Sequence, residues 1–324
     1  MTIGLVYIGK VMQIQPIPNA DKIELLTVVC GRGGKWSGCA QVGQFQEGSA
    51  CQVYLQDSLL PQTDEFAFME RHKYRVRMVR LRGVPSECLI MPQALPGDVG
   101  TDVTDLAGVE KYEKPLPLSV GGDIVGHFPA FIPKTDEPNF QAVPELVNAL
   151  RGLPWYATVK CDGTSATAYW NEGHLGVCSR NYELKGAPNN ALWKIAGQYR
   201  LDEQLPLLGN VAVQWEAVGP GIQGNPMSLK QIEPRAFNLW FIDEGRYAGY
   251  AEFCAACDRI GMPVVPWTNA GPAFSRNDED LRRMAEGLYV NGRQREGIVI
   301  RPQEEHTVNG ERLSFKVLNL LYKE

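Results

Sequence analysis

The N-terminal third of the chain consists of short apolar runs separated by strong turn signals. Runs suited to strands cover residues 5–14, 23–29, 50–55 and 74–81, and Gly, Pro, Asn and Asp bound them. Several strands packed into about 95 residues predict a small barrel, and the OB-fold is the natural candidate.

Strand and helix patterns mix beyond residue 118. Strands are predicted at 156–160, 164–170, 211–218, 236–242, 296–301 and 313–318. Helices are predicted at 189–199, 247–260 and 278–289. Residues 94–117 show no periodicity and suggest a linker. We therefore predict an α+β protein with an OB-fold domain at 1–95, a linker at 96–118 and a second domain at 119–324.

Composition excludes several classes of protein. With 324 residues and 44% hydrophobic content, the chain is long enough for about two packed domains and is not intrinsically disordered. No apolar stretch of about 18 residues exists, and the first residues lack a basic region, so we expect neither a membrane span nor a signal peptide. The eight cysteines are scattered, which predicts free thiols in a cytoplasmic protein. The net charge of −5, taken alone, argues against nucleic-acid binding.

The strongest local signal is the run Val159-Lys160-Cys161-Asp162-Gly163. A lysine ends an apolar strand, and Asp-Gly turns the chain into the next strand, so an amine and a carboxylate lie together at a sheet edge. Lysine is a nucleophile only when deprotonated, and burial and neighbouring cations lower its pKa. Alone, the pattern also fits an ordinary strand end beside a hairpin turn.

Further side chains of chemical interest follow in order, each on or beside a predicted strand: Arg180, Glu216, Phe237, Glu296 and Lys316. With the Lys-x-Asp-Gly run, this order resembles motifs I, Ia, III, IIIa, IV and V of the covalent nucleotidyltransferases, which include polynucleotide ligases and mRNA capping enzymes. Each motif is weak alone, but six in order are specific. The resemblance implies that the second domain is an adenylation domain of antiparallel sheets with flanking helices.

The resemblance also implies roles for these residues. Lys160 would be the nucleophile that becomes lysyl-AMP, with Arg180 and Lys316 as further catalytic residues. Lys316 would neutralise the α-phosphate and help to lower the pKa of Lys160. The implied ATP contacts are Val159, Lys160, Arg180, Glu216, Phe237, Glu296 and Lys316.

Metal and base contacts follow from the same comparison. Asp162, Glu216 and Glu296 would hold a hydrated Mg²⁺ or Mn²⁺, because hard cations prefer oxygen ligands. Phe237 would stack on adenine through its π face. Trp240 and Phe241 on the same strand leave the choice of aromatic open.

The order of the domains resembles one branch of this superfamily. DNA ligases and capping enzymes carry an OB domain after motif V, but only eight residues follow Lys316, so we expect none there. An OB domain before the chemistry resembles the Deinococcus- and Naegleria-type RNA ligases, as do segments 18–24, 81–86 and 133–137. Two departures predict weaker phosphate binding: Ser314 replaces a first motif V lysine, and Asn139 replaces an arginine.

A basic run at 71–82 carries six Lys or Arg residues and no acid. The predicted RNA contacts in it are Lys73, Arg75, Arg77, Arg80 and Arg82. We expect the first three to share one strand face, with a bulge or strand switch near Met78 before the others. Such a strand would follow a phosphate backbone, and this interpretation is preferred to the alternative of a solvated edge strand whose charge prevents aggregation.

We therefore predict an ATP-dependent RNA ligase that joins 3′-OH to 5′-phosphate ends through lysyl-AMP and RNA-adenylate. ATP and Mg²⁺ or Mn²⁺ are the expected cofactors, and RNA in a nicked duplex, as in repair, is the expected partner of a cytoplasmic monomer without membrane association. An ATP-dependent DNA ligase and a non-catalytic RNA-binding protein are open alternatives. The net charge of −5 is then the sum of acidic residues at the expected metal site and basic residues at 71–82, so the distribution of charge is more informative than its total.

Overall fold

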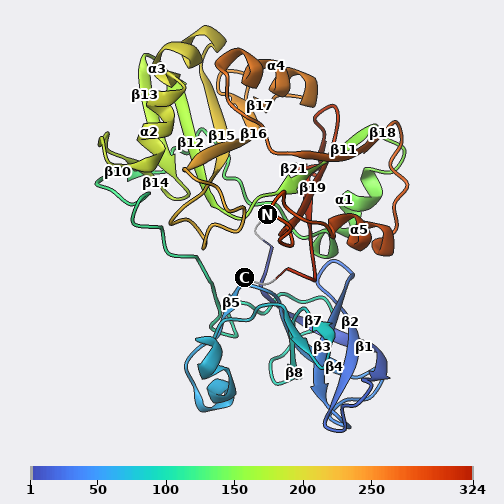
Figure 1. Ribbon diagram of the computed structural model, residues 1–324. Helices are drawn as coiled ribbons and strands as arrows, with labels where there is room; N and C mark the ends of the chain where they lie inside the picture. Colours follow the sequence, from blue (N-terminus) through green and yellow to red (C-terminus); the bar gives the residue numbers. More distant parts are fainter. Residues whose placement is uncertain (1–2, 323–324) are drawn as a thin grey trace. The chain divides into compact units, whose positions relative to one another are not determined.

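The structure is a computed structural model that describes residues 3–322, and it divides into two compact units (Figure 1). The first unit comprises Met1–Lys114 and Pro138–Glu145, and the second comprises Pro115–Glu137 and Leu146–Glu324. The strands pair antiparallel and helices pack on the sheets, so the predicted α+β class is confirmed.

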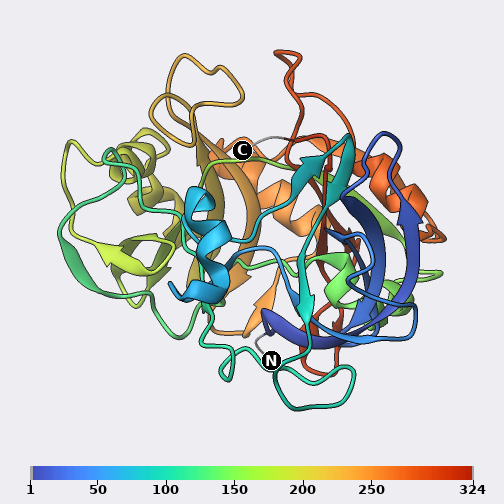
Figure 2. The same cartoon turned by 90° about the horizontal axis from the view of Figure 1, so that it is seen from below.

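A five-stranded sheet in the order β3-β2-β1-β4-β8 forms the first unit. Strand β1 pairs with β4 through Val6–Lys10 and with β2 through Lys10–Pro16, and a register shift between Val11 and Gln13 bends it. Figure 2 shows the resulting curvature of the blue strands. The strands are β1 (Val6–Pro16), β2 (Ile23–Cys30), β3 (Gly34–Gln41), β4 (Ala50–Tyr54) and β8 (Leu89–Pro92).

Both faces of this sheet carry apolar cores, because neighbouring residues of β1 point to opposite sides. Tyr7 and Val11 join one cluster, and Val6 and Ile8 join the other. Short elements complete the unit: β5 (Ser58–Leu59), η1 (Asp64–His72), β6 (Val79–Leu81), β7 (Val84–Ser86), β9 (Glu110–Lys111) and η2 (Phe140–Ala142).

The prediction of a strand at 74–81 is wrong, because most of this segment has no strand structure. Phe66 is buried and anchors the 3₁₀ helix η1, which Lys73 ends in a left-handed conformation with φ 54°. Tyr74 also has a positive φ of 58°, and two such residues in succession break a strand. Only Val79–Leu81 is a strand, paired with β7 in a hairpin. The basic residues before Met78 therefore do not share one strand face.

The second unit contains a seven-stranded sheet in the order β10-β14-β13-β12-β15-β16-β17. The predicted strand at 211–218 is confirmed as β15. The strands are β10 (Ile124–His127), β12 (Thr164–Asn171), β13 (His174–Ser179), β14 (Tyr182–Leu184), β15 (Val211–Val218), β16 (Glu233–Phe241) and β17 (Arg246–Tyr247).

Helices cover one face of this sheet (Figure 1). Their apolar residues join alternate residues of β12 and β15, such as Ala166 and Val213, in one core cluster. The covering elements are α2 (Ala191–Gln198), α3 (Leu201–Gln204), η3 (Leu205–Leu208) and α4 (Tyr250–Ile260).

A second sheet of this unit has the order β18-β11-β19-β22. Helix α5 packs against β19 and β22, and it ends at Ala285, so Tyr289 lies beyond the helix predicted at 278–289. The remaining elements are β11 (Trp155–Lys160), β18 (Trp267–Gly271), β19 (Gly297–Pro302), β22 (Phe315–Leu318), α1 (Pro144–Ala149), α5 (Asp278–Ala285), β20 (Thr307–Val308) and β21 (Glu311–Arg312).

Candidate active site

Lys160 is the last residue of β11, and its ammonium pairs with Glu296 from the segment just before β19. The Lys160 Nζ–Glu296 Oε1 distance is 2.7 Å, and both side chains are largely buried. Register explains the contact, because Lys160 lies opposite Gly297, the residue that follows Glu296. Strand pairing thus joins residues that lie 136 positions apart in the chain.

Gly297 is required at this point of the sheet. It has φ 156°, and a Cβ there would lie 2.2 Å from the carbonyl oxygen of Val317. Since directly opposite residues of antiparallel strands project to the same face, the missing side chain leaves room beside Lys160. The same face carries Lys316, which lies opposite Val299 on β22. Lys160 and Lys316 therefore share one face of the four-stranded sheet.

Two further carboxylates lie close to Lys160. Glu216 on β15 accepts a hydrogen bond from the Gly163 amide at 3.1 Å. Gly163 allows this approach, because a Cβ there would lie 2.8 Å from the Glu216 Cγ. Asp162, at the motif turn, is 5% exposed. The Lys-x-Asp-Gly run thus brings an amine and carboxylates together, as the pattern predicts.

The charges of this cluster influence one another. Burial alone would lower the pKa of Lys160, but Glu296, Glu216 and Asp162 together raise it above its ordinary value. Burial raises the pKa of Glu216 to about 8, against the opposing effect of Lys160 and with a contribution from the other two carboxylates. The predicted lowering of the Lys160 pKa is therefore wrong for the protein alone, because anions rather than cations surround the amine.

The three carboxylates supply the hard oxygen donors that Mg²⁺ and Mn²⁺ prefer. Within residues 3–322, no three His, Cys, Asp or Glu side chains lie close enough to enclose an ion directly. The arrangement fits a cation held largely through water, as Mg²⁺ usually is in proteins. Asp162, Glu216 and Glu296 are the residues that would hold it.

Phe237 is the extra residue of a β-bulge. Along the pairing of β15 with β16, Trp215 lies opposite Ala236 and Gln214 lies opposite Asn238, so Phe237 has no partner. Bulges re-aim side chains, and Phe237 is half-buried against an apolar cluster that includes Val159, the neighbour of Lys160. Trp240 packs in a different cluster, so the structure favours Phe237 as the aromatic beside the site.

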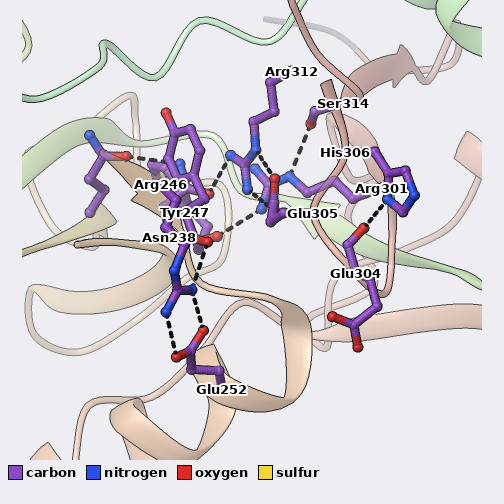
Figure 3. Close-up of polar contacts among 12 residues, drawn as sticks. Asn238, Arg246, Tyr247, Glu252, Arg301, Glu304, Glu305, His306, Arg312 and Ser314 are labelled. Carbon is purple, nitrogen blue, oxygen red and sulfur yellow. Dashed lines mark hydrogen bonds and ion pairs between the residues drawn. The ribbon is translucent and has the colours of Figure 1, made fainter. Parts of the chain in front are cut away.

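Arg301 explains the departure at position 314. Ser314 is buried, and its hydroxyl accepts a hydrogen bond from Arg301 Nε at 3.0 Å (Figure 3). Arg301 also pairs with Glu137 at 2.7 Å and donates to the carbonyl of Phe237 at 2.8 Å. Ser314 therefore hydrogen-bonds to a buried arginine whose positive charge is neutralised by Glu137.

A second polar chain runs beside this pair. Arg312 bonds Glu305 and donates to Asn238 Oδ1 at 2.8 Å, with its guanidinium 3.6 Å from the centroid of the Tyr247 ring (Figure 3). Asn238 in turn donates to Gln214 at 2.8 Å. These contacts join the β20–β21 hairpin to the seven-stranded sheet around Phe237.

Arg180, at the end of β13, pairs with Asp136 at 2.6 Å, and 39% of its side chain is exposed. Its neighbour Asn181 accepts a hydrogen bond from Lys134, and Thr135 and Ser165 share a hydrogen bond. Segment 133–137 is thus bound to the sheet at successive residues. Asn139 serves locally as the N-cap of η2, where its side chain accepts from Gln141 N.

The basic residues of the first unit have different environments. Arg75 pairs with Asp57 at 2.7 Å and lies over the ring of Tyr112, so its charge stabilises the fold. The side chains of the others reach solvent: Lys73, Arg77, Arg80 and Arg82. Burial lowers the pKa of His72, and Arg77 and Arg71 lower it further, which indicates a local concentration of positive charge.

Three residues around the site lie outside the motifs: Tyr289, Tyr322 and Arg301. The Tyr289 hydroxyl contacts the backbone of Lys160, and the Tyr322 hydroxyl contacts Asp162. No local pattern identifies the two tyrosines, because neither lies in a regular helix or strand. Arg301 follows the apolar residues of β19 and is itself buried. A charged residue in an otherwise apolar strand is the signal by which the sequence could have identified it.

Comparison with known proteins assigns both units. A family model described as RNA ligase matches residues 153–318, and a model described as an OB-fold domain matches residues 5–93. The curated proteins include no match to the chain. Within residues 3–322, no helix is long and apolar enough to span a membrane.

Solved structures of Naegleria gruberi RNA ligase resemble the whole chain. The enzyme with pyrophosphate is 30% identical, with a TM-score of 0.85 over 98% of this chain and 97% of that one. A lysine-to-alanine mutant with ATP and Mn is 29% identical, with a TM-score of 0.86 over 97% of both chains. A glutamate-to-alanine mutant with AMP and Mn has the same identity and TM-score over 98% and 97%. The predicted resemblance is confirmed, and the chain belongs to the RNA ligase family.

Proposed function

We propose that the protein is an ATP-dependent RNA ligase in which Lys160 attacks the α-phosphate of ATP. Pyrophosphate leaves, and AMP is held on Lys160 through a phosphoramidate bond. AMP then passes to an RNA 5′-phosphate, and an RNA 3′-OH displaces it to form the phosphodiester. The observation that carries this proposal is the Lys160 amine at the edge of a sheet, surrounded by three carboxylates, in a chain of the RNA ligase family.

The pocket residues support distinct tasks in this proposal. Lys316 shares the sheet face with Lys160 and would neutralise the α-phosphate, and Arg180 would contact ribose or phosphate. Phe237 and Val159 line the apolar cluster beside Lys160, which suits the adenine base. In this arrangement the phosphates of ATP lie among cationic side chains, and the adenine base lies against apolar side chains.

Deprotonation of Lys160 requires that the carboxylates be neutralised. A divalent cation at Asp162, Glu216 and Glu296 would supply positive charge that lowers the Lys160 pKa and offsets charge on the phosphoryl oxygens. The relatives solved with ATP or AMP also hold Mn. In the protein alone, the same carboxylates raise the pKa of Lys160 and favour its protonated form, which opposes attack on ATP until a cation is bound.

We propose that the exposed basic side chains of the first unit bind RNA. These are Lys73, Arg77, Arg80 and Arg82. Cations that follow one surface bind a phosphate backbone without reading its sequence. Arg75 is not part of this proposal, because Asp57 already pairs with it. We further propose that a nicked duplex is the substrate, and that the protein acts as a monomer in the cytoplasm, where its eight free cysteines stay reduced.

Labelling with α-³²P-ATP and Mn²⁺ or Mg²⁺ tests the nucleophile. The wild type is expected to retain label through denaturing electrophoresis and to lose it in acid, as a phosphoramidate does. Lys160→Ala and Lys160→Arg should both fail to label, and the arginine variant keeps the charge opposite Glu296, which separates nucleophile from ion pair. Lys194→Ala, at an exposed position of α2, is the control. Label on Lys160→Ala, or label from GTP alone, would contradict the proposal.

Sealing of nicked duplexes with all four RNA and DNA strand combinations tests the substrate. Sealing is expected with RNA at the 3′-OH side, because the 2′-OH distinguishes RNA from DNA. Equal sealing of an all-DNA nick would favour a DNA ligase. Binding without any sealing would favour a non-catalytic RNA-binding protein.

A further inference from the structure

Tyr289 holds the backbone on both sides of the Lys160–Glu296 pair. This tyrosine is 6% exposed and lies between α5 and β19. Its hydroxyl donates to the carbonyl of Lys160 at 3.2 Å. It accepts from the amide of Asp162 at 3.2 Å and from that of Glu296 at 3.4 Å. One phenol oxygen therefore spans the motif turn and the start of β19.

A second phenol reaches the side chain of Asp162. The Tyr322 hydroxyl donates to Asp162 Oδ2 at an O–O distance of 2.5 Å. A short hydrogen bond to a carboxylate is charge-assisted and is stronger than a neutral one. Asp162 is thus held at its amide by Tyr289 and at its carboxylate by Tyr322.

The chain beyond β22 is tied down so that Tyr322 reaches this position. Asn319 is 2% exposed, and its Nδ2 donates to Gln294 Oε1 at 3.0 Å and to the Arg295 carbonyl at 2.9 Å. Its amide donates to the carbonyl of Glu296 at 2.9 Å, and its own carbonyl accepts from the amide of Tyr322 at 3.0 Å. Asn319 therefore links the turn at Tyr322 directly to the backbone of Glu296, which is another of the three carboxylate residues at the site.

We propose that Tyr322 is a positioning residue for the divalent cation: it fixes the orientation of the Asp162 carboxylate, while Tyr289 fixes the Asp162 backbone. The inference rests on the proposed function only in that it takes Asp162 as a cation ligand. The hydrogen bond from Tyr322 to Oδ2 restricts rotation of the Asp162 carboxylate about its side-chain bonds. Removal of such an outer partner typically weakens metal binding by about 10- to 100-fold.

Tyr322→Phe removes this hydroxyl and keeps the ring. The matched control is Tyr169→Phe on β12, which also removes a phenol–carboxylate hydrogen bond, from Tyr169 to Glu183 at 2.9 Å, away from the site. Mn²⁺ binding to the full-length protein is measured by electron paramagnetic resonance without nucleotide. We expect the Mn²⁺ dissociation constant to rise by about tenfold or more in Tyr322→Phe and to stay at the wild-type value in Tyr169→Phe.

Lysyl-AMP formation across a range of Mn²⁺ concentrations is the second measurement. The half-saturating Mn²⁺ concentration should rise with the dissociation constant, while the rate at saturating Mn²⁺ stays within about threefold of the wild type, because the Lys160 nucleophile is untouched. Asn319→Ala, which cuts the tether and leaves Tyr322 in place, should shift Mn²⁺ dependence in the same direction.

The outcomes separate the two proposals. Equal Mn²⁺ affinity in the wild type and in both variants, Tyr322→Phe and Asn319→Ala, overturns the positioning role. Loss of rate at saturating Mn²⁺ with unchanged affinity also overturns it. If the wild type forms no lysyl-AMP, the proposed function fails, and the resonance titration still decides the inference. If Tyr322→Phe does not fold, the affinity of Asn319→Ala decides.

Discussion

Replacing Glu137 by Gln removes the negative charge that faces the buried guanidinium of Arg301. The two side chains are 14% and 4% exposed and lie 2.7 Å apart. Burial alone would raise the pKa of Glu137, but Arg301 and Arg312 lower it below its ordinary value of 4.5. The folded protein therefore holds an ionised carboxylate here, and Glu137→Gln leaves a buried cation without its counter-charge.

The cost follows from burial. Removing one partner of a buried ion pair costs about 3–5 kcal/mol, which for a domain of this size lowers Tm by roughly 6–20 °C. The exposed pair Arg283–Glu279 on α5, with a separation of 3.1 Å, provides the contrast. Glu279→Gln should cost only about 0.3–0.5 kcal/mol. Arg301→Met added to Glu137→Gln should recover part of the loss, because the unpaired charge is then gone.

Thermal denaturation followed by circular dichroism measures these differences. Because the folded pKa of Glu137 is depressed, its stabilisation is present above about pH 4.5 and is lost as pH falls. The Tm gap between wild type and Glu137→Gln should therefore narrow from pH 7 towards pH 3. The half-saturating ATP concentration for labelling should rise, since Arg301 also holds the Phe237 carbonyl. A loss no larger than that of Glu279→Gln, or a double variant as unstable as the single one, would refute the reasoning.

Four further predictions concern other parts of the molecule. Gly297→Ala should prevent stable folding of the second unit, seen as loss of its cooperative melting, because the new Cβ meets the Val317 carbonyl and φ is unfavourable. Phe237→Ala should raise the half-saturating ATP concentration for lysyl-AMP formation by about tenfold, whereas Phe237→Tyr should not. Arg82→Gln should weaken RNA binding and reduce its salt dependence by about one charge, as titrations at several salt concentrations would reveal. Arg75→Gln should instead lower Tm, because Arg75 pairs with Asp57 inside the fold.

Local pattern was sufficient for most of the regular structure of the second unit. Alternating apolar residues and glycine-rich turns predicted β15 at 211–218, and they placed β11, β12, β16, β19, β22 and the helices α2, α4 and α5 to within a few residues. The other strands of this unit were not predicted, and most of them are short. They failed at 74–81, where a buried phenylalanine and two left-handed residues produce a 3₁₀ helix and a break. Left-handed backbone at a lysine and a tyrosine has no signature in composition, so tertiary contacts decided that segment.

The chemistry of the motifs was also present in the sequence. Lys160, Asp162, Glu216 and Glu296 were predicted to meet, and strand register brings them together. Each of these residues lies in a short sequence motif that can be recognised without the structure. The order of the motifs along the chain indicates the family.

Only the tertiary structure decided which groups surround those residues. The phenols of Tyr289 and Tyr322 reach Asp162 from segments without regular structure, across 127 and 160 positions of the chain. The bulge at Phe237 and the bond from Arg301 to Ser314 depend on how neighbouring strands align, which no local pattern specifies. The charge state of Lys160 belongs here too, because its pKa depends on carboxylates delivered by other strands. A sequence records side chains and their local spacing, whereas hydrogen bonds and electrostatic shifts depend on distances that folding alone establishes.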